Sequence, residues 1–192
     1  MKADRLRDHE EARRRLLEDG TPSFLDAVTA LIAYRSEVQK RCRQVVESGL
    51  KEYSLALKVT LTRDDVVDAA WPSVLKWEGD WWSLGVEIKR NNIPGVRWWE
   101  AVCYLQYERG ENGLFCWFGE RLPNRKLAAH LFGKFHQENQ SVMHEDKEVW
   151  LQHGLQEGEI ASLDELLEGL FQQWIGIWRK VGGIAEAFKD FR

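Results

Sequence analysis

The sequence predicts an α+β fold in which helices pack on a mostly antiparallel sheet of about four strands. Apolar residues recur at three- and four-residue spacing near both ends of the chain, which is typical of helices. In the middle of the chain they alternate with polar residues, which is typical of strands with one buried face. The strand-like segments follow one another through turn-like sequences, which favours antiparallel pairing over parallel βαβ units.

Helices are predicted on both sides of the strand region. Residues 1–20 are rich in helix formers but poor in apolar residues, so we expect a loosely attached N-terminal helix followed by a single α+β domain over 21–192. A long helix is expected from Ser23 to about Tyr53. Two C-terminal helices are expected, over about 124–138 and from Ser162 to the Gly182-Gly183 pair.

Four strands are predicted between these helices. The first rests on the alternation of Leu55, Leu57, Val59 and Leu61 with more polar residues. The next two contain the Trp-Trp pairs, and the fourth follows a glycine-containing turn sequence. The predicted strands span about 55–62, 81–89, 98–107 and 114–118.

Composition and charge narrow the classes of function. The formal charge is −4 and the basic residues are scattered, so a nucleic-acid partner is not expected. The sequence contains no apolar run of the roughly 18 residues that a membrane span needs, so we expect a cytoplasmic protein without a membrane partner. The three cysteines include no CxxC pair, and we interpret Cys103 and Cys116 as thiols of the core. His136, Glu138 and His144 match no zinc spacing and are interpreted as surface residues.

The segment WWSLGVEIKR, residues 81–90, places Glu87 and Lys89 on one face of a predicted strand, with Asp80 directly before it. This Glu-x-Lys pattern with an upstream Asp resembles the PD-(D/E)XK nuclease signature. The resemblance implies a metal-dependent nuclease, or a degenerate relative, in which Asp80 and Glu87 hold Mg or Mn while Lys89 positions or activates water.

A second interpretation treats the same segment as an amphipathic strand whose polar side faces solvent. Asp80 lies close along the chain to Glu87 for the nuclease pattern, and the segment that follows has the pattern of another strand. On this interpretation the segment contributes no catalytic residue, metal site or cofactor. We then expect Glu87→Ala and Lys89→Ala to leave folding nearly intact.

Tryptophan is the unusual residue, with ten in the chain. Alternation in the two central strands places Trp82 and Trp99 in the core with Leu84, Val86, Ala101 and Cys103. The opposite face then carries Trp81, Trp98, Tyr104 and Glu100. Aromatic residues beside charged ones are common at protein interfaces, so we interpret these four residues as a partner-binding face.

Three functions follow from these patterns. The first is a non-enzymatic protein-binding regulator or inhibitor, of the type found among immunity proteins, antitoxins and phage anti-defence proteins. The alternatives are the nuclease and a single-stranded nucleic-acid binder that stacks bases on the aromatic face. A homodimer is also expected, through the apolar stripe of Val28, Leu31, Val38, Cys42 and Val45 on the long helix.

Overall fold

The computed structural model describes residues 22–68, 81–93, 96–108, 113–155 and 162–191. It divides into two compact units, Met1–Glu37 and Val38–Arg192. The sheet belongs to the second unit, together with the helices that follow it and residues 38–57 of the long helix that precedes it.

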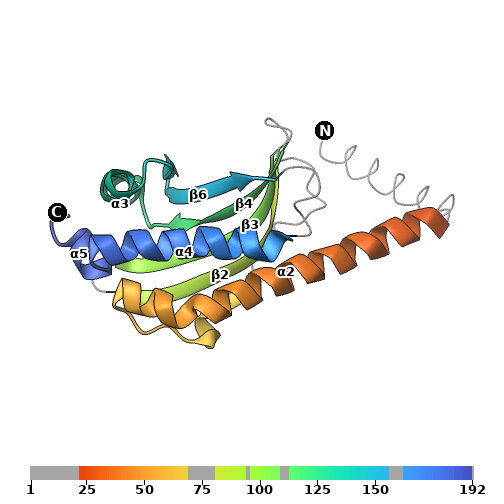
Figure 1. Cartoon of the computed structure of the whole chain (residues 1–192), viewed down its shortest axis with the longest axis horizontal. Helices are drawn as coiled ribbons and strands as arrows, with labels where there is room; N and C mark the ends of the chain where they lie inside the picture. The colour runs from red at the N-terminus through yellow and green to blue at the C-terminus, as the bar shows by residue number, and fades with distance from the viewer. Residues whose placement is uncertain (1–21, 69–80, 94–95, 109–112, 156–161, 192) are drawn as a thin grey trace, which may run out of the picture. The chain divides into compact units, whose positions relative to one another are not determined.

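The second unit is built on one antiparallel sheet of six strands in the order β1-β2-β3-β4-β6-β5. Each pair of neighbours in this order is antiparallel. The long strands β2, β3 and β4 form its centre (Figure 1). The strands are β1 (Val66–Asp68), β2 (Trp81–Ile93), β3 (Val96–Glu108), β4 (Gly113–Arg121), β5 (Met143–Glu145) and β6 (Glu148–Gly154).

The helices of this unit pack on one face of the sheet. Figure 1 shows α4 and the C-terminal part of α2 crossing the sheet on the same side. Phe171 of α4 stacks on Phe118 of β4 with 4.5 Å between ring centroids, and Tyr53 of α2 meets Phe171 at 5.2 Å. The helices are α2 (Pro22–Leu57), α3 (Arg125–Glu138), α4 (Leu163–Val181) and α5 (Ile184–Phe188), with a short 3₁₀ turn, η1 (Arg63–Asp65), before β1.

The predicted α+β class, the antiparallel pairing and the flanking helices are confirmed. Helix α3 is capped by Asn124, whose side chain accepts a hydrogen bond from the Leu127 amide. Helix α4 ends at Gly182, where the sequence predicts a break. The predicted N-terminal helix over 1–20 lies outside the described residues.

The predicted number of strands is wrong, because the sheet has six strands and not about four. Three strands were missed: β1, and β5 and β6, which form a hairpin within the polar segment that follows α3. In β6, Val149 and Leu151 are buried and alternate with the partly exposed Glu148, Trp150 and Gln152. The alternation of a strand is therefore present, but it extends over only a few residues. Asp146 adopts a positive φ of 49° at the turn, which Asp tolerates better than most residues.

The strand predicted over 55–62 is also wrong. Residues 55–57 complete α2, and 58–62 connect it to η1. Leu50, Tyr53 and Leu57 are buried at the spacing of one helix face, whereas Leu55 is 66% exposed. Burial of that helical face against the sheet outweighs the local alternation, because packing energy routinely overrides a short propensity signal.

The helix-covered face of the sheet is the hydrophobic core. Leu84, Val86, Trp99, Ala101 and Cys103 are buried there, as predicted from strand alternation. The side chain of Trp82, predicted to join them, lies outside the described residues. Cys103 and Cys116 are buried, which confirms their interpretation as core thiols, and Cys42 is buried as well.

One carboxylate lies in this core. Glu120 of β4 is fully buried, and its Oε1 accepts hydrogen bonds from Tyr53 Oη at 2.5 Å, Trp178 Nε1 at 2.7 Å and Trp174 Nε1 at 3.0 Å. Its Oε2 has no hydrogen-bond partner among the described residues. Burial disfavours the charged form and raises the pKa of Glu120 from 4.5 to about 8, although the three donors act in the opposite direction. The carboxyl group therefore ties α2 and α4 to β4 while holding a proton near neutral pH.

Glu120 should make folding stability depend on pH. Between pH 4.5 and about 8 the folded protein holds a proton that the unfolded chain releases, so the free energy of unfolding falls as pH rises. Across that window the free energy of unfolding should fall by about 1.4 kcal/mol per pH unit because of Glu120. Above it, Glu120 should add no further pH dependence. Urea unfolding at several pH values should show this slope in the wild type and lose it in Glu120→Gln.

The exposed Glu165 of α4 supplies the matched control, because Glu165→Gln changes the same chemical group outside the core. That variant should keep the pH slope of the wild type. An unchanged slope in Glu120→Gln would show that the buried carboxyl group does not titrate as described.

Candidate functional site

The candidate site is the sheet face opposite the helices, which we call the aromatic–ionic face. Strand register arranges its side chains in rows that cross β2, β3, β4 and β6. One row is ionic, one is aromatic, and a third lies between them. The face consists of Glu87, Lys89, Glu100, Val102, Tyr104, Trp117, Arg121, Glu148 and Trp150.

The aromatic part is a stack of three rings. Tyr104 of β3 is directly opposite Trp117 of β4, and their ring planes are 7° apart with centroids 5.5 Å apart. Trp150 of β6 contacts Trp117 at 5.6 Å between centroids. Tyr104 and Trp117 are buried and form a small cluster with Val102, whereas Trp150 is partly exposed at its margin. Offset and tilted ring pairs of this kind add stabilisation beyond the area that they bury.

Two glycines let the rings lie flat against the sheet. Gly85 is paired with Tyr104, and a Cβ atom at Gly85 would lie 2.8 Å from the Tyr104 ring and closer still to a backbone oxygen. Gly119 is paired with Trp150, and a Cβ atom there would lie 2.5 Å from Trp150 Cβ. A side chain at Gly85 would displace the Tyr104 ring, and one at Gly119 would press against the backbone that carries Trp150.

The ionic row alternates in charge across four strands. Lys89 pairs with Glu100, Glu100 with Arg121, and Arg121 with Glu148 in the strand register. Arg121 donates from Nε to Glu148 at 2.8 Å and from NH1 to Glu100 at 3.2 Å, and Lys89 Nζ lies 3.6 Å from Glu100. Burial lowers the pKa of Arg121, but its hydrogen bond and ion pair with Glu148 outweigh that effect, so the net pKa is raised. Opposite charges placed directly across strands favour this register over its alternatives.

Glu87 joins the two parts of the face. It is only 5% exposed, its Oε1 accepts a 2.6 Å hydrogen bond from Tyr104 Oη, and its Oε2 lies 2.5 Å from Lys89 Nζ. Burial, followed by the hydrogen bond to Glu87, raises the pKa of Tyr104, and the hydrogen bond to Glu87 raises that of Lys89. Tyr104 therefore stays a neutral donor and Lys89 stays charged near neutral pH.

The structure brings together four of the residues that the sequence singled out: Glu87, Lys89, Glu100 and Tyr104. Asp80 and the side chains of Trp81 and Trp98 lie outside the described residues. Glu87 is buried, so it is not the solvated side chain of the amphipathic interpretation, although the Lys89–Glu100 contact expected there is present.

Sequence reasoning missed the half of the face contributed by β4 and β6: Trp117, Arg121, Glu148 and Trp150. Its signal was the alternation of Trp117, Gly119 and Arg121 within β4, which places them on one face. The pairing of β4 with β6 was not predicted, because helix α3 and strand β5 separate the two strands in the chain.

The geometry of Glu87 and Lys89 bears on the nuclease interpretation. The Lys89 ammonium group neutralises the Glu87 oxygen that a cation would bind, and the second oxygen is held by Tyr104. In the part of the chain that the structure describes, no three His, Cys, Asp or Glu side chains are grouped to hold a metal ion. His136 and His144 both lie beside the Phe132 ring, at 4.9 Å and 5.3 Å between centroids, as aromatic neighbours.

Comparisons with known proteins give no information on the function of the chain. No protein-family model, no curated protein and no solved structure matches the chain. Among the described helices, none is both long enough and apolar enough to span a bilayer.

Glu87 and Lys89 should differ sharply in their effect on stability. Glu87→Ala leaves the buried Tyr104 hydroxyl without its acceptor, so we expect a loss of about 1–3 kcal/mol. Lys89→Ala removes a side chain that is 45% exposed, and the expected loss is below about 1 kcal/mol. Guanidinium unfolding of both variants measures this difference, and losses of equal size would contradict the buried role of Glu87. The structure thereby revises the expectation that Glu87→Ala is nearly neutral.

Proposed function

We propose that this protein is a non-enzymatic regulator or inhibitor that binds another protein through the aromatic–ionic face and acts in the cytoplasm. One observation carries the proposal: fixed opposite charges and a partly exposed tryptophan lie side by side on a sheet face where no described helix of Val38–Arg192 packs. By class this corresponds to an immunity-protein, antitoxin or phage anti-defence function.

The arrangement has the anatomy of a protein interface. Trp and Arg are the residues that most often anchor binding, and both Trp150 and Arg121 are reachable from solvent. Lys89 and Glu148 are also partly exposed, and their charges are held by neighbours before any partner arrives. Preorganised side chains lose less conformational entropy on association, which favours affinity.

The proposal assigns different roles to the residues predicted from sequence. Tyr104 and Trp117 are buried, so their role is to hold Glu87 and Trp150 in place through the hydrogen bond and the ring contact. Glu100 is partly exposed and contributes a fixed negative charge beside Lys89. Trp81 and Trp98 stay proposed contact residues, on strands β2 and β3.

The two alternative functions receive less support. A nuclease would need Lys89 to leave Glu87 before a cation could bind there. A single-stranded nucleic-acid binder needs free ring faces, but Tyr104 and Trp117 stack on each other. Neither function explains the alternation of charge across four strands.

Substitutions on the aromatic–ionic face should weaken partner binding. Trp150→Ala removes the partly exposed ring, and Trp98→Ala tests the ring predicted from sequence; each should lower affinity by at least about tenfold if it anchors the interface. Capture on the immobilised full-length protein and mass spectrometry would identify the partner, and surface plasmon resonance with that purified partner would measure the affinity.

Lys126→Glu on the exposed side of α3 is the control, because it changes a charge on a helix away from the aromatic–ionic face. It should bind like the wild type. Equal affinity of Trp150→Ala, Trp98→Ala and the wild type would refute this interface. Magnesium- or manganese-dependent cleavage of DNA or RNA that disappears in a folded Glu87→Ala variant would establish the nuclease function instead.

Homodimer formation is a separate prediction. Val38, Cys42 and Val45 of the helical stripe are buried within the second unit, so a seam between copies would depend on the part of α2 around Val28 and Leu31. Light scattering at micromolar concentration should return twice the 22.5 kDa chain mass and fall on dilution. A mass of 22.5 kDa at every concentration would exclude the dimer.

A further inference from the structure

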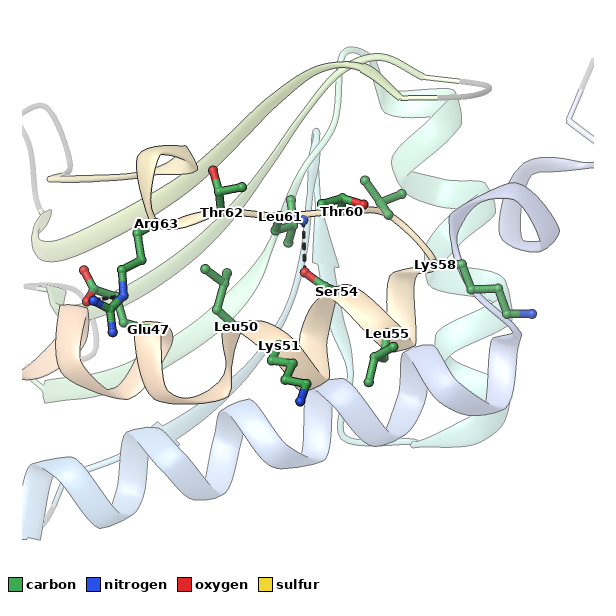
Figure 2. Close-up of a pocket in the computed structure, with 11 residues that line it drawn as sticks. Glu47, Leu50, Lys51, Ser54, Leu55, Lys58, Thr60, Leu61, Thr62 and Arg63 are labelled. Atoms are coloured by element: carbon green, nitrogen blue, oxygen red, sulfur yellow. Dashed lines mark hydrogen bonds and ion pairs between the residues drawn. The ribbon is translucent and has the colours of Figure 1, made fainter.

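A second surface lies away from the aromatic–ionic face, at the C-terminal end of α2. There the last turns of the helix and residues 58–63 form the two walls of an open groove. Figure 2 shows Leu50 and Leu61 between the helix and this connection, where the Leu61 amide donates to Ser54 Oγ at 3.0 Å. Both leucines are mostly buried and form an apolar floor.

Leu55 is the most unusual residue of the groove. It is 66% exposed, and Met143 is the one other large apolar side chain counted as exposed among the described residues. Lys51 precedes Leu55 by four positions, so these two side chains follow one side of the helix, and Lys58 comes directly after the helix end. Lys51 and Leu55 project from the same side of α2 in Figure 2. An exposed leucine between two lysines is a small apolar contact with a cationic border.

The groove is positively charged within a chain whose net charge is −4. Lys51, Lys58 and Arg63 line it, and Glu47 is its single acidic residue. Glu47 is paired with Arg63 at 3.5 Å and with Arg43 at 3.4 Å, so its charge is already matched. Lys51 and Lys58 form no ion pair among the described residues.

Lys58 occupies a backbone conformation that favours glycine. Its φ is 57°, in the left-handed region, directly after the last residue of α2. The amides of Lys58 and Val59 donate to the carbonyls of Leu55 and Ser54, which completes the helix end. Glu186, whose charge acts on Lys58, is itself ion-paired with Lys189. Lysine therefore occupies a position where glycine would fit with less strain, and such local strain is common at binding sites.

We propose that this groove binds an acidic peptide segment of a partner protein, with an apolar side chain of that segment packed on Leu55. The carboxylates of the segment would pair with Lys51, Lys58 and Arg63, whose charges the chain itself leaves unmatched or only partly matched. The floor of Leu50 and Leu61 gives the apolar side chain a dry contact. This site is independent of the aromatic–ionic face, because it is built from other elements.

Two other classes of partner fit the groove less well. Membrane surfaces are bound by clusters of about four to eight basic residues, and the groove has three beside a carboxylate. Single-stranded nucleic acids are bound by stacking on aromatic rings, and the lining of the groove contains none. An acidic segment with one apolar anchor matches both the charge and the leucines.

Fluorescence anisotropy with the full chain tests the proposal. The probe is a fluorescein-labelled peptide of Glu, Asp and Leu residues, and a peptide in which Lys replaces Glu and Asp is its counterpart. The acidic probe should bind, with an affinity that falls as salt is raised, and the basic one should not. Leu55→Ser and Lys51→Glu should each weaken binding of the acidic probe by at least about tenfold.

Matched variants separate binding from folding. Met143→Ser removes the other exposed apolar side chain, and Lys126→Glu reverses a charge on α3; both should bind the probe like the wild type. Lys58→Gly removes a groove cation while relieving the left-handed strain, so its melting temperature should hold or rise while its affinity falls. Absence of binding, or equal binding by Leu55→Ser, would overturn the proposal. The proposal would also be overturned if the protein bound phosphatidylserine vesicles, lost that binding in Leu55→Ser, and did not bind the acidic peptide.

Discussion

The pairing register of β2, β3, β4 and β6 is the constraint on which the other features of this protein depend. Because side chains alternate along a strand, a slip of one residue would exchange the two faces of the sheet. The observed register places Ala101 beside Glu120 on the helix-covered face and Glu100 beside Arg121 on the other. The apolar core and the charged row are therefore two results of one alignment, and each disfavours the slipped alternatives.

The two faces of the sheet surround a buried carboxyl group with different partners. Glu120 has three aromatic donors and no ion-pair partner among the described residues, so burial dominates and its carboxyl group favours the neutral form. Glu87 is almost as buried but has Lys89 and the Tyr104 hydroxyl as partners. The ammonium group of Lys89 and the hydroxyl group of Tyr104 replace the water that burial removes from Glu87.

The two proposed binding surfaces use different physical contacts. The aromatic–ionic face is nearly balanced in charge, so it suits a partner surface with both signs and an apolar pocket for Trp150. The groove beside Leu55 is one-sided in charge and small, so it suits a short acidic segment. A regulator with two such contacts could hold one partner at two points, which raises the effective affinity without enlarging either interface.

The sequence by itself determined the fold class, helices α3 and α4, and the inward side chains of β2 and β3. These depend on local periodicity, caps and alternation, which are properties of short segments. It also placed Glu87, Lys89, Glu100 and Tyr104 on one face, because that requires only the period of a strand.

Tertiary structure decided what local pattern could not. Residues 55–57 are helical because Tyr53 and Leu57 pack in the core, although the local alternation favours a strand. The contacts of Glu100 with Arg121, and of Arg121 with Glu148, depend on the pairing of β4 with β3 and β6, and helix α3 and strand β5 lie between β4 and β6 in the chain. The same is true of Glu120, whose donors come from two helices distant in the chain. Such long-range contacts form only when separate elements pack together, so no window of the sequence contains them.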